Sequence, residues 1–382
     1  MPQVRKKVYD FNSFQVLQWK PHKEYNLSSI FNDDLISELI KKLESGGISY
    51  LEHDYLQKII SCTLLIQQYN KVREKKTELM ISHYYNWLLK NQDQTNLSPK
   101  TKTEYFLLKI DIENYYSFFG DKNYKSPISH FKKLQVLADI WGYSLLRQKE
   151  SVLQFLCIIM EKIYEIPAHL NSEILLLLSK NWQPILSPIA AISDRRFSLQ
   201  EIRDYFFGKH GLSNTDSCFE NHTLPNSDRL FSLTTPEFTN HLFIPKNDGF
   251  DIFEASQVVH EFQHIQDAPR CVENSLFVSE KNALQAERVF LNIVGTGKKG
   301  KYCWLESNLF YPILLLKWEL DIILKDTYNK ENFHKICHDH GMESLTLSSL
   351  FDWKAPFQLS AYCAASMELE LGWKNFVIPN QK

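Results

Sequence analysis

The chain has 382 residues, and its 43 lysines and arginines nearly balance its 45 aspartates and glutamates, which leaves a formal net charge of −2. Because both signs of charge are mixed along the sequence and no apolar run reaches the roughly 18 to 20 residues of a membrane span, nucleic-acid and membrane partners are disfavoured. The seven cysteines are scattered and never spaced as CxxC, so we expect a cytoplasmic protein with reduced thiols.

Three consecutive regions are expected, either as separate units or as one integrated domain. The first, residues 1–95, is predicted to be helical, because apolar residues recur at spacings of three and four in "DLISELIKKLES" and "YLQKIISCTLLIQQYNKV". The paired glycines of "ESGGISY" are expected to separate two helices. The polar stretch "KNQDQTNLSPKTKTE", residues 90–104, is expected to be an exposed connection.

The second region, residues 96–215, is also predicted to be helical. Helical periodicity returns in "SHFKKLQVLADIWGYSLL", "SVLQFLCIIMEKIYEI" and "SEILLLLSKNW", and the prolines of "WQPILSPIAAISDRRF" interrupt it. The aromatic residues from Tyr105 to Phe119 could line a peptide groove, but packing in a core is the favoured interpretation.

The third region, residues 216–382, contains the strongest strand candidate, "HLFIP", followed by a turn at "KNDG". A helix should begin next, with Asp251 as its cap and Glu254 completing a capping box, and Pro269 should end it. Its apolar side is predicted to contain Phe253, Val258, Phe262 and Ile265. A second helix is predicted to start at Ser279 in "SEKNALQAERVFLNIVG". Its apolar stripe, Ala283, Leu284, Leu291 and Val294, also includes Glu280 and Glu287.

The first of these helices carries the sequence H-E-x-x-H. His260 and His264 are four residues apart, so their rings lie on one face about one turn apart, where a single ion can bind both. Glu261 follows the first histidine and is placed to hold or deprotonate a water at the ion. The alternative is a pair of surface histidines on an ordinary helix.

Two imidazoles need a third protein ligand. No third histidine follows at the short spacing, so a carboxylate from the next helix is the natural candidate. Glu280 is the first choice, because small Ala283 one turn on would allow two helices to approach around an ion, and Glu287 is the second, as ligand or as a ligand's neighbour. The alternative for either glutamate is a surface pair with Lys281, Arg288 or Lys298.

Other polar clusters have simpler explanations. The histidines and cysteine of "NKENFHKICHDHG" (His334, Cys337, His338 and His340) could bind metal, but a helix end with histidines near its C-terminal dipole is favoured. "GTGKKGKY" lacks the serine or threonine of a phosphate-binding loop and is predicted to be a basic turn. Arg270 and Arg288 are weak candidates for binding an anionic substrate or cosubstrate, as are Arg195, Arg196 and Arg229.

The segment "HLFIPKNDGFDIFEASQVVHEFQH" resembles the HExxH-containing family of peptide-modification proteins encoded beside ribosomally made peptide natural products. The likeness is clear from Phe238 to Gln266 and weaker in "LESNLFYPILLLKWELDI". It implies a metal at His260 and His264 with Glu261 beside it. Some members of that family look like iron and 2-oxoglutarate-dependent hydroxylases of peptide side chains, and this function is preferred by a narrow margin.

The stretch "SEKNALQAE" is also similar to the E-x-x-A pattern of gluzincin-type zinc peptidases, in which Glu261 would be the general base. A third alternative is a binding protein with a structural ion. All three share their ligands, which suit zinc or ferrous iron. We therefore expect a mainly α fold with a small β element before the active-site helix, and a zincin-like HExxH helix packed against a Glu-bearing helix. The expected partner is a peptide or protein substrate, and a homo-oligomer is permitted.

Overall fold

Helices make up most of the described chain in the computed structural model, which is therefore mainly α. The structure describes residues 20–24, 33–70, 73–91, 97–120, 129–184, 195–208, 219–224, 230–234, 240–245, 249–267, 275–326, 329–342, 355–371 and 373–379. Two compact units are present, each built from two segments that are separate in the sequence, whereas the sequence predicted three consecutive regions or one integrated domain. The first unit is Met1–Pro127 with Arg196–Val272, and the second is Ile128–Arg195 with Glu273–Lys382.

The first unit begins with helices that confirm the predicted apolar periodicity. They are α2 (Asp33–Glu44), α3 (Tyr50–Asn70), α4 (Lys75–Asn91) and α5 (Pro99–Phe118). The predicted exposed connection over residues 90–104 is wrong from Pro99 onward, because α5 starts there. The Ser98 side chain accepts a hydrogen bond from the Thr101 amide and proline occupies the first turn, which are both helix-start signals.

The first unit also contains a four-stranded sheet. Its strands, in spatial order, are β1 (Lys20–Glu24), β3 (Phe219–Leu224), β5 (Asn240–Pro245) and β4 (Phe231–Thr234). The strand predicted at "HLFIP" is confirmed as part of β5. Strands β1, β3 and β5 run parallel, and β4 runs antiparallel to β5 at one edge of the described sheet.

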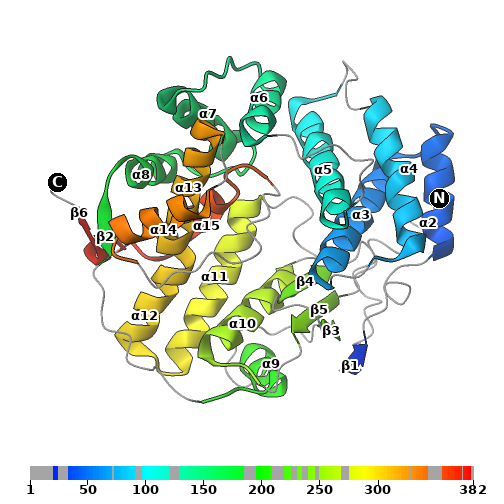
Figure 1. Ribbon diagram of the computed structural model, residues 1–382. Coiled ribbons are helices and arrows are strands. Elements are labelled where there is room, and N and C mark those ends of the chain that lie inside the picture. Colours follow the sequence, from blue (N-terminus) through cyan, green and yellow to red (C-terminus); the bar gives the residue numbers. More distant parts are fainter. Residues whose placement is uncertain are drawn as a thin grey trace. The chain divides into compact units, whose positions relative to one another are not determined.

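The two faces of this sheet have different partners within the first unit. Phe231 of β4 and Phe243 of β5 stack with ring centroids 4.7 Å apart and belong to the same core cluster as apolar residues of α2, α3, α4 and α5. Tyr105, Tyr115 and Tyr116 are buried too, which confirms core packing for these aromatic residues of α5, whereas Phe118 at its end is exposed. Ser232, one residue after Phe231, turns to the other face and bonds to helix α10 (Ile252–Asp267), which contacts both β4 and β5. Helix α10 therefore lies against the sheet face opposite to the N-terminal helices (Figure 1).

Helix α9 (Leu199–Phe207) completes the surroundings of α10 in the first unit. Phe197 and Phe250 exchange backbone hydrogen bonds just before α9 and α10 begin. The rings of Phe206 and Phe262 then meet with centroids 5.5 Å apart, and both side chains are fully buried. Helix α10 is thus fixed by apolar contacts on its buried side.

The second unit is helical apart from a short pair of strands. Its helices before the break in the chain are α6 (His130–Ile140), α7 (Lys149–Lys162) and α8 (Ala168–Ser179), as the periodicity predicted. Those after it are α11 (Leu276–Ile293), α12 (Gly297–Leu305), the π-helix η3 (Glu306–Phe310), α13 (Tyr311–Lys325), α14 (Lys330–Asp339), α15 (Leu359–Leu369) and the 3₁₀ turn η4 (Trp373–Phe376). Strand β2 (Trp182–Pro184) pairs antiparallel with β6 (Val377–Pro379).

Two predicted boundaries in the second unit are wrong. Helix α11 starts at Leu276 instead of Ser279, because the Ser275 side chain accepts the hydrogen bond from the Val278 amide that marks the cap. The stretch "GTGKKGKY" is not a basic turn, since helix α12 begins at Gly297. Helix α12 has an apolar side, where Tyr302 and Trp304 are buried, but its several lysines made this side hard to recognise in the sequence.

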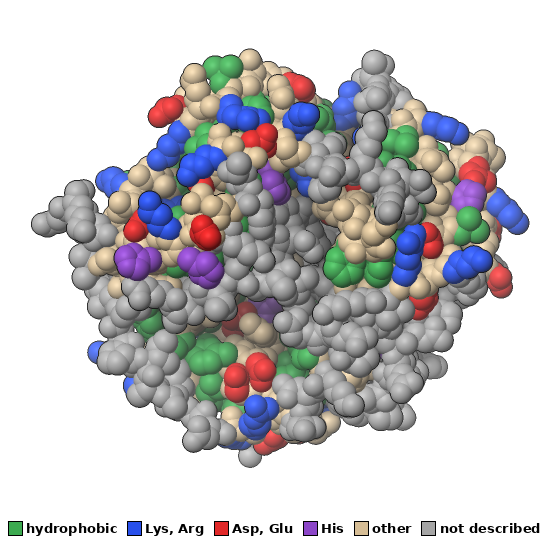
Figure 2. Space-filling model, in the orientation of Figure 1, with side chains coloured by type: hydrophobic (Ala, Val, Ile, Leu, Met, Phe, Trp, Pro, Cys, Tyr) green, Lys and Arg blue, Asp and Glu red, His purple; other side chains and the backbone are tan. Residues whose placement is uncertain are grey.

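Acidic and basic side chains lie interspersed on the molecular face drawn in Figure 2, in keeping with the nearly balanced composition. Within the described ranges, every helix is either too short or too polar to cross a lipid bilayer.

Candidate metal centre

Helix α10 starts with the predicted capping box. The carboxylate of Asp251 accepts hydrogen bonds from the amides of Phe253 and Glu254, each at 2.8 Å, and Glu254 accepts one from the Asp251 amide at 2.8 Å. These three bonds satisfy donors that a helix N-terminus leaves free. The predicted apolar side is confirmed at Val258, Phe262 and Ile265, which are buried, while the predicted stop at Pro269 lies outside the described residues.

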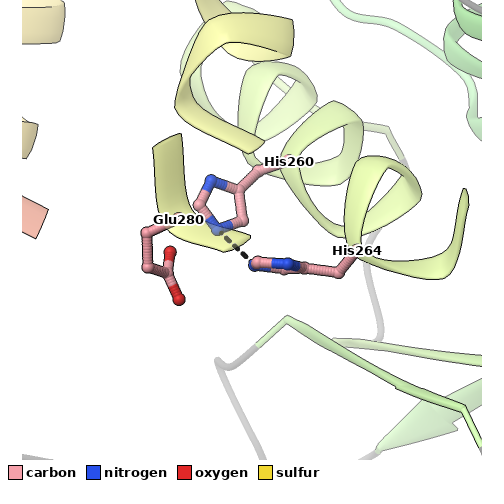
Figure 3. Close-up of side chains that lie close together, drawn as sticks. All are labelled: His260, His264 and Glu280. Carbon is pink, nitrogen blue, oxygen red and sulfur yellow. Dashed lines mark hydrogen bonds between the residues drawn. The ribbon is translucent and has the colours of Figure 1, made fainter. Parts of the chain in front are cut away.

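The rotation of α10 turns both histidines of the motif to one side. His260 is 8% exposed and His264 is half-buried, and their Nε2 atoms lie 2.9 Å apart. The rings meet nearly edge to face, at an interplanar angle of 78° (Figure 3). A tetrahedral ion with Zn–N bonds of the usual length would hold these nitrogens about 3.3 Å apart. Small side-chain rotations would therefore bring the two nitrogens to the separation that an ion requires.

Glu261 points toward the sheet from the same helix. One of its carboxylate oxygens, Oε2, accepts two hydrogen bonds from Ser232 of strand β4, from the amide at 2.8 Å and from the hydroxyl at 2.6 Å. Bonds of this length to a carboxylate are charge-assisted and strong. The acid beside the first histidine is thereby attached to the sheet through one oxygen.

Helix α11 carries two buried carboxylates in an otherwise apolar stripe, as the sequence predicted. Glu280 is 4% exposed and Glu287 is 5% exposed, and Ala283 between them is fully buried. The two glutamates are seven positions apart, which corresponds to about 10.5 Å along a helix, so a single ion cannot bind both at their present positions. Glu287 accepts a hydrogen bond from the Asn308 side chain at 3.0 Å.

Three of the predicted ligands come together. One ligand atom from each of His260, His264 and Glu280 lies within 4.8 Å of the others, and Glu287 is not in this group (Figure 3). Among the residues that the structure describes, this is the one group of three such side chains close enough to hold a metal ion. A buried carboxylate is costly unless a positive charge or hydrogen bonds compensate it, and an ion beside Glu280 would supply that charge.

Two of the three basic residues considered as surface partners of these glutamates, Lys281 and Arg288, pair with other carboxylates. Lys281 pairs with Glu368 at 2.6 Å, and Arg288 pairs with Glu370 at 2.9 Å. Lys301 of α12 also reaches Glu370, at 2.9 Å, so this buried carboxylate joins α11, α12 and the end of α15. Arg288 therefore holds helices together. Arg229 and Arg270 lie outside the described residues.

His340 binds a backbone carbonyl at the C-terminus of helix α14, which confirms the favoured interpretation for this histidine. His340 follows the last helical residue, and its Nδ1 lies 2.7 Å from the Ile336 carbonyl. Its Nε2 lies 3.0 Å from the Lys317 ammonium, which also donates to the Lys180 carbonyl at 2.6 Å. Burial lowers the pKa of His340 to about 4 and that of Lys317 to about 8.

Two polar residues of this region were not singled out from the sequence. Ser232 contacts Glu261 from 29 positions away, and Asn308 contacts Glu287 from 21 positions away. The signal for Ser232 was faint, because a serine in a short apolar strand such as "FSLT" is common. Comparisons with protein-family models, curated proteins and solved structures find no match to this chain.

Proposed function

We propose that this protein is a mononuclear metalloenzyme that acts on a peptide or protein substrate. His260, His264 and Glu280 are its proposed ligands, and the observation that carries the proposal is their convergence to within 4.8 Å. Two imidazoles and one carboxylate leave coordination positions open, which a catalytic site needs and a purely structural site does not. The proposal includes a zincin-like arrangement, in which the HExxH helix packs against a helix bearing the third ligand.

The preferred reaction is hydroxylation of a peptide side chain during maturation of a ribosomally made peptide. Ferrous iron with 2-oxoglutarate supplies the oxidising chemistry when bound. One atom of dioxygen enters the side chain as a hydroxyl group, and the other enters the new carboxylate of succinate as 2-oxoglutarate loses carbon dioxide. The resemblance of residues 238–266 supports this choice. So does the attachment of Glu261 to Ser232, since this reaction requires no base at that position.

A second candidate is hydrolysis of a peptide bond by a zinc enzyme. It is favoured by the small residue Ala283 one turn after Glu280, as in the E-x-x-A pattern. It is also favoured because both hydrogen bonds from Ser232 go to Oε2 of Glu261, which leaves its other carboxylate oxygen to act as a base. In this reaction Glu261 would take a proton from the attacking water and pass it to the leaving amine. An ion with only a structural role gains nothing from an acid beside its first ligand.

The deciding experiment begins with anaerobic purification and identification of the bound metal. The protein is then incubated with ferrous iron and 2-oxoglutarate. Succinate formation that disappears in His260→Ala and persists in His338→Ala, a matched change of an exposed histidine, supports the hydroxylase. Native zinc and cleavage of a peptide library that is lost in Glu261→Gln would establish the peptidase instead. If neither activity occurs and His260→Ala only lowers the melting temperature, the ion is structural.

A further inference from the structure

Strand β4 offers an unusual donor to the motif helix. Ser232 is paired with Leu242 in the antiparallel ladder, yet its amide donates to the Glu261 carboxylate instead of to β5. In such a ladder every second residue turns its amide away from the neighbouring strand. On the edge strand of the described sheet that amide is free for another acceptor, and Glu261 supplies it.

The hydroxyl of the same residue doubles the attachment. Ser232 Oγ donates to the same oxygen at 2.6 Å, so two donors of one residue meet one carboxylate oxygen. Glu261 is half-buried, where such bonds compete with water less than they would at the surface. The carboxylate is therefore held in a defined place beside β4.

This place matters because Glu261 directly follows His260 in the chain. A carboxylate is a strong ligand for divalent ions, and a glutamate adjacent to a ligand can swing toward the ion by rotating its side chain. Once there, it would fill a position that substrate or cosubstrate needs. A 2-oxoacid that binds through two oxygens, together with dioxygen, requires three open positions.

We propose that Ser232 is a positioning residue that holds Glu261 on strand β4 and so prevents it from becoming a fourth protein ligand of the ion. This inference rests on the proposed metal site, and it explains what would keep coordination positions of the ion open for substrate or cosubstrate. It assigns a role to a residue outside the HExxH motif.

The test uses the full chain loaded with Co²⁺, whose visible absorption reports the number and kind of its ligands. Ser232→Ala removes the hydroxyl donor and leaves only the backbone amide, so Glu261 is held less firmly and should then join the ion. We expect a changed spectrum and Co²⁺ affinity that rises about 10-fold, the order of effect that outer groups of metal sites have. Ser232→Thr restores a hydroxyl and should keep the wild-type spectrum. Ser256→Ala is the matched control, because Ser256 lies on α10 and donates to the Phe253 carbonyl instead.

The double variant Ser232→Ala with Glu261→Gln identifies the added ligand. If Glu261 is responsible, this variant returns to the wild-type spectrum and affinity. A Ser232→Ala protein with the spectrum and affinity of the wild type would overturn the inference and leave the metal site intact.

A separate measurement distinguishes this failure from failure of the proposed function. In the metal-free protein, the melting-temperature shifts of Ser232→Ala and Glu261→Gln should be clearly non-additive in the double variant, because both changes break the same contact. Additive shifts would contradict the inference even if Co²⁺ binds. If Co²⁺ does not bind, or binds equally well to His260→Ala, the proposed function is contradicted, and the inference with it.

Discussion

Helix α10 and the end of helix α14 each bring histidines close together in the sequence, and these histidines have different roles. In α10, His260 and His264 are four residues apart, and their Nε2 atoms meet at 2.9 Å. At the end of α14, His338 and His340 are two residues apart, so the first is exposed while the second is buried and bonds to Ile336 and Lys317. His334 and His338 of α14 are four residues apart as well, yet both are exposed, so spacing alone does not distinguish the two helices. Burial distinguishes them, and position relative to the helix end decides whether a backbone carbonyl binds one of the imidazoles.

The largest expected effect separates these two pairs directly. His260→Ala should weaken binding of Zn²⁺ or Fe²⁺ by more than about 100-fold, because it removes a ligand and leaves one imidazole, whereas loss of an outer group costs about 10–100-fold. His338→Ala should leave the affinity unchanged. Competition with a chromophoric chelator measures both. Equal metal affinities in the two variants would show that the histidines of α10 contribute no more to metal binding than those of α14.

A second test compares the two glutamates of α11. Glu280→Gln should lower metal affinity by about 100-fold, while Glu287→Gln should lower it by no more than about 10-fold, since Glu287 binds Asn308 and lies outside the ligand group. The same chelator titration applies. A larger loss for Glu287→Gln would reassign the third ligand.

The pH dependence of stability should identify the structural histidine. The folded-state pKa of His340 is about 4, lowered first by burial and then by Lys317, against an unfolded value near 6.5. The unfolded chain therefore binds more protons between these values, so stability is fully present above pH 6.5 and falls as pH drops toward 4, by about 3 kcal/mol.

Chemical denaturation of the wild type and His340→Gln at several pH values between 7 and 4 checks this expectation. The variant should be less stable at pH 7 and should lose less stability on acidification. His130, whose burial also lowers its pKa to about 4, contributes equally to both proteins and cancels in the difference. His338→Gln, at an exposed site, should follow the wild type. Parallel curves for the wild type and His340→Gln would contradict the assignment.

The smallest expected effect concerns the start of α10. Asp251→Ala removes the acceptor for two amides and should reduce the free energy of unfolding of the first unit by about 1 kcal/mol. Asp251→Asn keeps an acceptor and should cost less. Metal affinity should change little in either variant, because the histidines lie two or more turns away. A large loss of metal binding would mean that the cap positions the ligands.

Local signals accounted for the features that could be predicted. The start of α10 was readable because Asp251, Glu254 and the apolar residues of one face lie within a few turns of one another. The start of α5 was missed because the lysines and threonines after Pro99 suggested a loop, although serine followed by proline is a start signal. Helix α12 was missed for a similar reason, since glycines and lysines outnumber apolar residues in its first turn.

Contacts distant in sequence could not be predicted. Strands β1 and β3 pair across nearly 200 residues, and the two segments of each unit come together only in the folded chain. At the candidate site, the motif identified two candidate ligands, but Glu280 and Glu287 shared one stripe and periodicity could not separate them. The sequence signal for Ser232 was faint, because only the register of β4 on β5 turns its amide toward Glu261.

The π-helix η3 is a segment in which the deletion of a single residue should disturb the packing of the helices on either side. A π-turn contains about one residue more than an α-turn, so η3 shifts the angular phase between α12 and α13 by roughly 100°. Asn308 lies within it, bonding through its side chain to Glu287 and through its carbonyl to Ser366. Deleting one residue from η3 would restore a regular helix, but it would rotate α12 or α13 away from the helices that it packs against. Within residues 306–310, a shortened chain should therefore be more harmful than most substitutions.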